Sequence, residues 1–247
     1  MKKLSICLLA LFAAVQLRAQ VSTEVAGAQP GERSEAGDTA RREWLTGFAT
    51  VEVAGPFAIR FMRVADDEAP RIEFDTRGCT RSRFRAEVRD RVLRITERDV
   101  AGRDTQTAVT LYYNRLDAVS VSDAGAEFAD TLRGTLFDLT VGGTASVAAT
   151  FDVGDLRVVL SGRSEAVLEG SARYLTAAVS TGTLAAYGLA TTAVAVEVSN
   201  SGRAEVRPAD RLEAVVATGG KVAYRGAPEI VRTRTGFMGG TIERTEK

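Results

Sequence analysis

The feature that most constrains this sequence is a repeat of about nineteen residues that runs through its second half. Three apolar residues at alternate positions return five times, and the first members of successive triplets are 19, 19, 19 and 18 positions apart. Alternation with a period of two is typical of a half-buried strand, so each triplet predicts a strand with one inward face. The triplets are Phe137/Leu139/Val141, Leu156/Val158/Leu160, Leu175/Ala177/Val179, Val194/Val196/Val198 and Leu212/Ala214/Val216.

A polar, glycine-containing segment follows each triplet. Glycine accepts a positive φ without a Cβ clash, so these segments predict tight corners at which the strand turns. A second pair of small apolar residues comes after each corner, as at Leu184/Ala186, and each repeat therefore contributes two strands. The corners are Gly142-Gly143, Ser161-Gly162, Ser180-Thr181-Gly182, Ser199-Asn200-Ser201-Gly202 and Thr218-Gly219-Gly220.

A repeat this short cannot bury its own apolar side, so the repeats must stack on one another. We therefore predict an all-β fold, a right-handed parallel β-helix (β-solenoid) with about nineteen residues per coil, because parallel crossovers are right-handed in nearly all proteins. A β-sandwich also has short strands and many turns, but it has no reason to keep this phase. The solenoid would align five residues in one inward ladder: Phe137, Leu156, Leu175, Val194 and Leu212.

The preceding part of the chain, residues 44–113, also has the alternation of strands. Its runs are separated by Gly, Pro and Asp residues that are typical of turns. These strands are either the first coils of the solenoid or a separate cap, followed by the regular coils of residues 114–247. The expected strands are Phe48–Val53, Phe57–Val64, Arg71–Asp75, Phe84–Val88, Val92–Thr96 and Ala108–Tyr113.

The first twenty residues have the pattern of a secretory signal. Lys2 and Lys3 precede an uncharged, mostly apolar run over residues 4–17, and a small residue stands before an expected cut near Ala19 or Gln20. We expect a signal peptide at 1–20, a flexible leader without apolar period at 21–43, and a folded domain at 44–247. The protein is then exported to the periplasm or to the cell surface and extracellular space. No later run reaches the roughly 20 apolar residues of a membrane helix, so no integral membrane segment is expected.

The composition excludes several classes of function. With 32 basic and 32 acidic residues the net charge is zero, which argues against a nucleic-acid partner. Histidine is absent, which excludes Ser-His-Asp and Cys-His nucleophilic sites and histidine-containing zinc sites. We therefore predict a protein that is not an enzyme, with no catalytic residue, no metal site and no cofactor.

Several segments carry a resemblance to a known family. They are the strand pair at 48–53 and 57–61, the pattern Val88-Arg89-Asp90-Arg91-Val92-Leu93-Arg94-Ile95, the segment Val222-Ala223-Tyr224-Arg225-Gly226-Ala227-Pro228, and Gly239-Gly240-Thr241-Ile242. Over residues 44–242 the chain resembles the head GIN domain family, described as "putative auto-transporter adhesins" of Bacteroidetes-type bacteria. The resemblance implies a secreted right-handed parallel β-helix. The family's doubled Ser-Gly corner is altered at Ser122–Gly125 and Ser161–Ser164, so ligand chemistry at those corners is not carried over.

Two functions remain open from the sequence. The first is a cell-envelope binding or structural module, an adhesin that presents a regular β-helix face to a cell-surface glycan or protein. The alternative is a polysaccharide lyase or hydrolase that acts through surface carboxylates, because paired carboxylates can cleave glycosidic bonds. Acidic residues gather in the first regular coils, although no pair has a motif-grade spacing: Asp117, Asp123, Asp130, Asp138, Asp152 and Asp155.

Three residues are weak candidates for ligand binding. Tyr187 and Tyr224 follow corners and would stack on sugar rings, although such aromatics more often close a core row. Asn200 would offer a side-chain amide to a glycan, although corner Asn, Ser and Thr residues more often bond their own backbone. Terminal coils of a solenoid expose unpaired strand edges, so a homodimer through the solenoid end is a further expectation.

Overall fold

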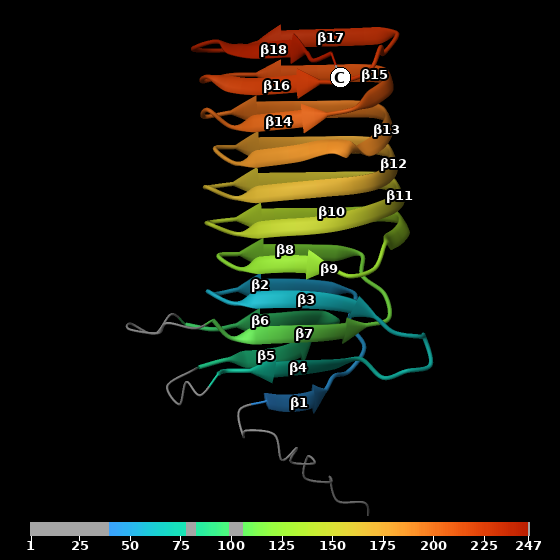
Figure 1. The fold of residues 1–247 in the computed structure, drawn as a ribbon, viewed down its shortest axis with the longest axis vertical. Coiled ribbons are helices and arrows are strands. Elements are labelled where there is room, and N and C mark those ends of the chain that lie inside the picture. The colour runs from blue at the N-terminus through green and yellow to red at the C-terminus, as the bar shows by residue number, and fades with distance from the viewer. Residues whose placement is uncertain (1–39, 78–82, 99–105, 247) are drawn as a thin grey trace, which may run out of the picture. The chain divides into compact units, whose positions relative to one another are not determined.

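The computed structural model describes residues 40–77, 83–98 and 106–246, and every regular element in these ranges is a strand (Figure 1). Contacts divide the chain into residues 1–31 and residues 32–247, and all described residues belong to the second unit. The expected signal peptide lies outside the described residues, within which no helix is long and apolar enough to cross a membrane. The strands are β1 (Ala40–Trp44), β2 (Thr50–Ala54), β3 (Ala58–Arg63), β4 (Arg71–Asp75), β5 (Arg85–Arg89), β6 (Val92–Thr96), β7 (Ala108–Tyr113), β8 (Ala118–Ser122), β9 (Gly125–Phe128), β10 (Leu132–Gly142), β11 (Ser146–Ser161), β12 (Glu165–Ser180), β13 (Thr183–Ser199), β14 (Arg203–Val206), β15 (Pro208–Val216), β16 (Gly220–Tyr224), β17 (Ile230–Thr235) and β18 (Gly240–Arg244).

The strands of the second half wind into stacked coils. β10, β11, β12, β13 and β15 pair in parallel, and Leu156 aligns with Leu175, which aligns in turn with Val194. These partners are nineteen residues apart, and the expected ladder from Phe137 to Leu212 is present in full. The prediction of a β-solenoid with about nineteen residues per coil is therefore confirmed.

Each coil has two strand faces around one apolar interior. We call the face that carries β2, β8, β15 and β17 face A, and the face that carries β3, β9, β14, β16 and β18 face B. The long strands β11, β12 and β13 turn a corner, with their first halves on face B and their second halves on face A. Alternate residues are buried along β7 to β16, and Leu156 and Leu212 are both 0% exposed. The apolar period of two therefore gives one continuous core.

The corners depart in detail from the expectation that glycine carries the positive φ. Gly162 does so, at +73°. At the next two corners the positive φ lies on the preceding residues, Thr181 (65°), Asn200 (50°) and Ser201 (63°). Asparagine adopts this region more readily than threonine or serine. At these corners the glycine provides room for the neighbouring coil, since a Cβ on Gly202 would lie 3.1 Å from the carbonyl oxygen of Val179.

The first strands are stacked out of sequence order. β2 pairs in parallel with β6 on one side and with β8 on the other, and β3 lies in the same way between β7 and β9. Coil β2–β3 is therefore inserted between coil β6–β7 and coil β8–β9 (Figure 1). The sequence left open whether residues 44–113 are first coils or a cap. In the structure they form both, two coils of the solenoid and a cap.

The cap consists of antiparallel strands. β4 pairs with β7, β5 pairs with β6, and β1 pairs with the outer edge of β4. The rings of Phe74 and Phe84 stack there with centroids 4.3 Å apart. Strand β1 begins at Ala40, so the last four residues of the expected leader, 40–43, are in a strand. Their polar sequence has no apolar period because β1 is exposed along its whole length and is held by backbone pairing.

Candidate functional site

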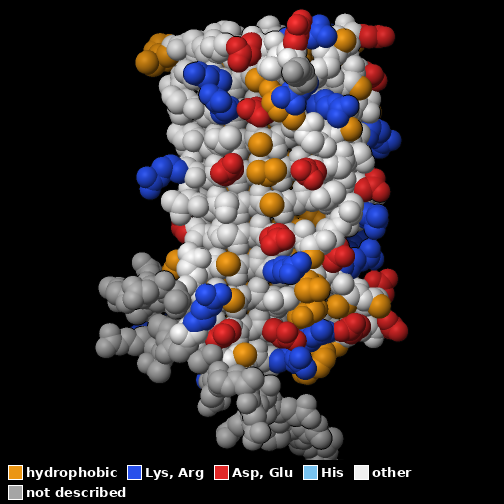
Figure 2. Space-filling model, viewed as in Figure 1, with side chains coloured by type: hydrophobic (Ala, Val, Ile, Leu, Met, Phe, Trp, Pro, Cys, Tyr) orange, Lys and Arg blue, Asp and Glu red, His pale blue; other side chains and the backbone are white. Residues whose placement is uncertain are grey.

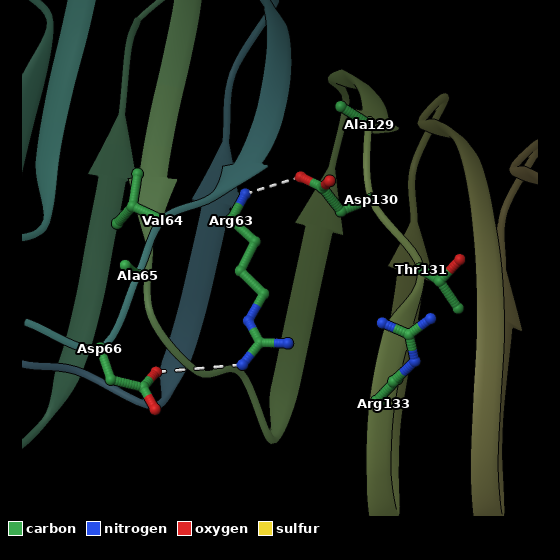
Figure 3. Close-up of a pocket in the computed structure, with 8 residues that line it drawn as sticks. All are labelled: Arg63, Val64, Ala65, Asp66, Ala129, Asp130, Thr131 and Arg133. Atoms are coloured by element: carbon green, nitrogen blue, oxygen red, sulfur yellow. Dashed lines mark hydrogen bonds and ion pairs between the residues drawn. The ribbon is translucent and has the colours of Figure 1, made fainter. Parts of the chain in front are cut away.

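One hollow of about 690 Å³ lies where the chain leaves β3 and where it passes from β9 to β10 (Figure 3). Its wall carries two arginines and two aspartates: Arg63, Asp66, Asp130 and Arg133. Figure 3 shows Arg63 between the two aspartates, with its backbone nitrogen toward Asp130 and its guanidinium toward Asp66. Asp130 belongs to the acidic group that the sequence predicted, and in this hollow it lies beside arginines.

The charges of this hollow are occupied by contacts within the protein. The backbone N–H of Arg63 donates to Oδ2 of Asp130 at 2.8 Å, and its Nε donates to the carbonyl oxygen of Asn114 at 3.2 Å. The guanidinium of Arg63 also lies 3.9 Å from Asp66. These bonds join the ends of β3, β7 and β9. At this point the inserted coil β2–β3 lies between its two neighbouring coils. The hollow is explained by this structural role.

Tyr113 is buried next to this hollow, and it predicts a sensitivity to alkaline pH. Burial, assisted by the charge of Asp130 and opposed by Arg63, raises the pKa of Tyr113 to about 12. The unfolded chain loses this proton near pH 10, so the stability from neutral Tyr113 is fully present below pH 10 and is lost as pH rises through 12. The loss amounts to about 2–3 kcal/mol.

Urea unfolding at about pH 9 and about pH 11.5 measures this effect. We expect Tyr113→Phe to lose less stability between these two pH values than the unaltered protein, because phenylalanine does not titrate. An equal loss in both proteins would show that Tyr113 has no part in the alkaline transition.

A second hollow of about 570 Å³ lies on face B over β14, β16 and β18. We call it the Tyr187 groove and define it by the residues that carry its chemistry: Tyr187, Arg203, Glu205, Lys221, Arg225 and Glu243. The strand period aims them outward, because they alternate with buried residues such as Ala204 and Val222. In Figure 2 basic side chains gather near the upper end of this face, at the level of β14 and β16.

The centre of the Tyr187 groove is a stacked pair. The guanidinium carbon of Arg225 lies 3.9 Å from the centroid of the Tyr187 ring, which is cation–π distance. Nε of Arg225 is buried and has no hydrogen-bond partner among the described residues. The ring therefore holds a planar set of N–H donors in place, a geometry suited to a carboxylate.

Two further cations stand side by side in this groove. Arg203 and Lys221 are direct register partners on neighbouring strands of face B. Within the described parts of the chain neither residue has an ion-pair partner within 4.0 Å. Like charges directly opposite one another destabilise a sheet, and a bound anion would relieve this repulsion. The acidic residues Glu205 and Glu243 are kept apart by Ala223, which lies between them in the same row.

The three residues predicted from the sequence do not form one site. Tyr187 lies in the groove. Tyr224 precedes Arg225 but is on the inward row beside Val206, and its ring packs partly buried against the core. Asn200 is at the corner between β13 and β14, where its Nδ2 donates to Oγ of Ser180 in the neighbouring coil at 2.9 Å.

The cations of the groove were missed from the sequence. A signal was present, since Arg203 and Lys221 are one repeat apart and therefore fall in one outward row. The apolar rows determine the fold and led to the prediction of the solenoid, whereas the cations lie in the polar rows between them. Among the described residues there is also no cluster of three or more Cys, Asp or Glu that could hold a metal ion.

Comparison with known proteins gives one family and a group of similar structures. The model of the family described as "Putative auto-transporter adhesin, head GIN domain" matches residues 47–228. A search of curated proteins found no match. The chain is similar to a crystal structure of a "putative adhesin" from Bacteroides fragilis, with 18% identity, a TM-score of 0.75, and coverage of 83% of this chain and 96% of that one.

Two further crystal structures have the same fold. A "putative adhesin" from Parabacteroides merdae has 20% identity and a TM-score of 0.66, and the match covers 84% of this chain and 96% of that one. A "putative lipid binding protein" from Parabacteroides distasonis has 13% identity and a TM-score of 0.62, with coverage of 85% and 98%. At these identities the similarity shows the fold alone.

Proposed function

This chain belongs to the head GIN domain family, and on that premise we propose that it is a non-catalytic binding module of the cell envelope that holds an acidic glycan in the Tyr187 groove. The observation that carries the proposal is the set of three cations, Arg203, Lys221 and Arg225, that face a hollow without ion-pair partners among the described residues. In the hollow beside Arg63, by contrast, the charges are joined to one another.

The spacing of the cations favours a polymer over a small anion. Neighbouring strands are about 4.8 Å apart, so Arg203 and Lys221 repeat along the stack at roughly the length of one sugar unit. A polysaccharide with one carboxylate per sugar would meet these cations in succession. The outer edge of the Tyr187 ring would contact the apolar side of a sugar.

The location and the absence of catalysis belong to the same proposal. We infer export to the periplasm or the cell surface, because the first twenty residues have the pattern of a secretory signal and the family is described as adhesins. The carboxylates beside Arg63 hold strand ends together, which leaves the lyase or hydrolase alternative without an assigned acid or base.

Calorimetric titration with oligogalacturonate, and with a neutral glucan of equal length, tests the proposed site. We expect the acidic oligomer to bind and the neutral one not to bind. Tyr187→Ala and Lys221→Glu should each weaken binding about tenfold or more, equivalent to about 1.4 kcal/mol. Binding should also weaken as salt is added, because exposed charges are screened.

The matched control is Tyr174→Ala. Tyr174 is 46% exposed and has the guanidinium of Arg173 at 5.2 Å from its ring centroid, but it lies outside the groove. This variant should bind like the unaltered protein. Equal binding of both oligomers, or equal losses in the two tyrosine variants, would reject the site. Release of unsaturated or reducing ends during the incubation would reject a non-catalytic role.

A further inference from the structure

The two ends of the described stack differ. At one end the antiparallel strands β1, β4 and β5 cover the last coil. At the other end β17 pairs only with β15 and β18 only with β16 among the described residues. Four of the nine exposed large apolar residues of the described chain lie in the coil at this second end, which β17 and β18 form. They are Ile230, Val231, Phe237 and Met238.

The outer edge of β17 has free backbone donors. The N–H of Gly236 donates to the carbonyl oxygen of Val216 at 2.7 Å, so residue 236 faces β15. Because successive residues of a strand face opposite sides, the N–H groups of Val231, Thr233 and Thr235 face away from β15. These groups form the row of donors that an added strand requires.

The side chains beside this edge carry positive charge. Arg232 and Arg234 point outward on face A, while Val231 and Thr233 continue the inward row above Leu212 and Ala214. Arg232 lies 3.3 Å from Glu213, which Arg211 also contacts, and Arg234 has no ion-pair partner among the described residues. The three arginines thus outnumber the one carboxylate, and the edge keeps an excess of positive charge.

We propose that the edge of β17 binds an extended segment of a partner protein with acidic residues at alternate positions and apolar residues between them. The segment would add one strand to face A by main-chain hydrogen bonds, as in β-augmentation. Its acidic residues would lie opposite Arg232 and Arg234, and its apolar residues would cover Val231 and the inward row. This surface is separate from the Tyr187 groove on face B.

The same edge disfavours a second copy of this chain. Two copies of β17 related by a two-fold axis pair antiparallel, with directly opposite residues on the same side of the sheet. Pairing centred on Thr233 sets Arg232 opposite Arg234 of the second copy, and pairing centred on Arg232 sets this residue opposite itself. Like charges at these positions are destabilising. The experiment must therefore distinguish binding of a partner segment from the homodimer expected from the sequence.

Fluorescence anisotropy with two labelled peptides tests the proposal. One peptide alternates Glu and Val, and the other alternates Lys and Val. We expect the Glu peptide to bind the protein and the Lys peptide to bind at least about tenfold more weakly. The double variant Arg232→Glu/Arg234→Glu should reverse this preference, because only the sign of the edge charge has changed.

Thr233→Pro separates strand addition from simple charge attraction. Proline removes one outward N–H and leaves the bonds to β15 in place, so the variant should fold but bind neither peptide. Circular dichroism and thermal unfolding check its fold. Arg203→Glu, in the groove, should leave peptide binding unchanged, so that failure of the edge and failure of the groove are distinguishable.

Three results would overturn the proposal. The first is no binding of the Glu peptide up to about 1 mM, and the second is equal binding of both peptides. The third is a dimer in light scattering that Thr233→Pro dissociates, since the edge would then take a second copy of this chain.

Discussion

Leu156→Ala is expected to lower the free energy of unfolding by about 2–5 kcal/mol, the cost of removing buried methyl groups and leaving a cavity. Leu156 is 0% exposed and is held between Phe137 of one neighbouring coil and Leu175 of the other. Neither coil can move inward to fill the space, because the backbone hydrogen bonds fix the distance between strands. Equilibrium unfolding in urea measures the change.

Val159→Ala is the matched control for this substitution. Val159 is in the same strand, three residues on, but it points outward and is 46% exposed. Its truncation should change stability by no more than about 0.5 kcal/mol. If both substitutions cost the same, the ladder of inward residues would not be what holds the coils together.

Gly170→Ala is expected to destabilise the protein by about 3 kcal/mol or more, through two effects that add. Gly170 has a φ of +95°, which an L side chain rarely adopts. A Cβ there would also lie 2.1 Å from the carbonyl oxygen of Phe151 in the neighbouring coil. Relief of that contact requires a backbone shift in a ladder that is paired on both sides.

Two other glycines separate these effects. Gly239 has a φ of +69° but open space around the position of a Cβ, so Gly239→Ala should cost about 1–2 kcal/mol from backbone strain alone. Gly47 has neither feature, and Gly47→Ala should be neutral within about 0.5 kcal/mol. Thermal unfolding measures the stability of the three variants, and we expect Gly170→Ala to be the least stable and Gly47→Ala the most stable. A Gly170→Ala variant as stable as Gly47→Ala would contradict the described packing of β11 against β12.

The repeat was enough to predict the regular half of the fold. Strand periodicity and a constant coil length are local properties, so residues such as Leu175 and Val194 could be aligned by counting. The earlier strands were also found, and Arg71–Asp75, Val92–Thr96 and Ala108–Tyr113 match β4, β6 and β7 residue for residue. The sequence did not predict the spatial order of these strands. A later strand can join either edge of β2, and the choice depends on contacts between residues distant in sequence.

The candidate site was predictable only in part. Tyr187 was named because it follows a corner, a rule that also named Tyr224 and Asn200. The structure places Tyr224 on the inward row and bonds Asn200 to Ser180, so this rule does not distinguish a surface aromatic from a packed one. The row of Arg203 and Lys221 is found by counting one repeat along the polar positions, but the sequence prediction followed only the apolar positions.

The insertion of coil β2–β3 determines how the chain can fold as it emerges from the ribosome, N-terminus first. Both edges of this early coil stay unpaired until later strands are made, because Val51 pairs with Leu93 on one side and with Val119 on the other. Closing these long loops is entropically costly and slow. From β10 onward, each coil needs only the one made just before it. Folding therefore has two stages. The first coils form only after about half of the chain has been made, and each later coil then adds rapidly to the coil before it.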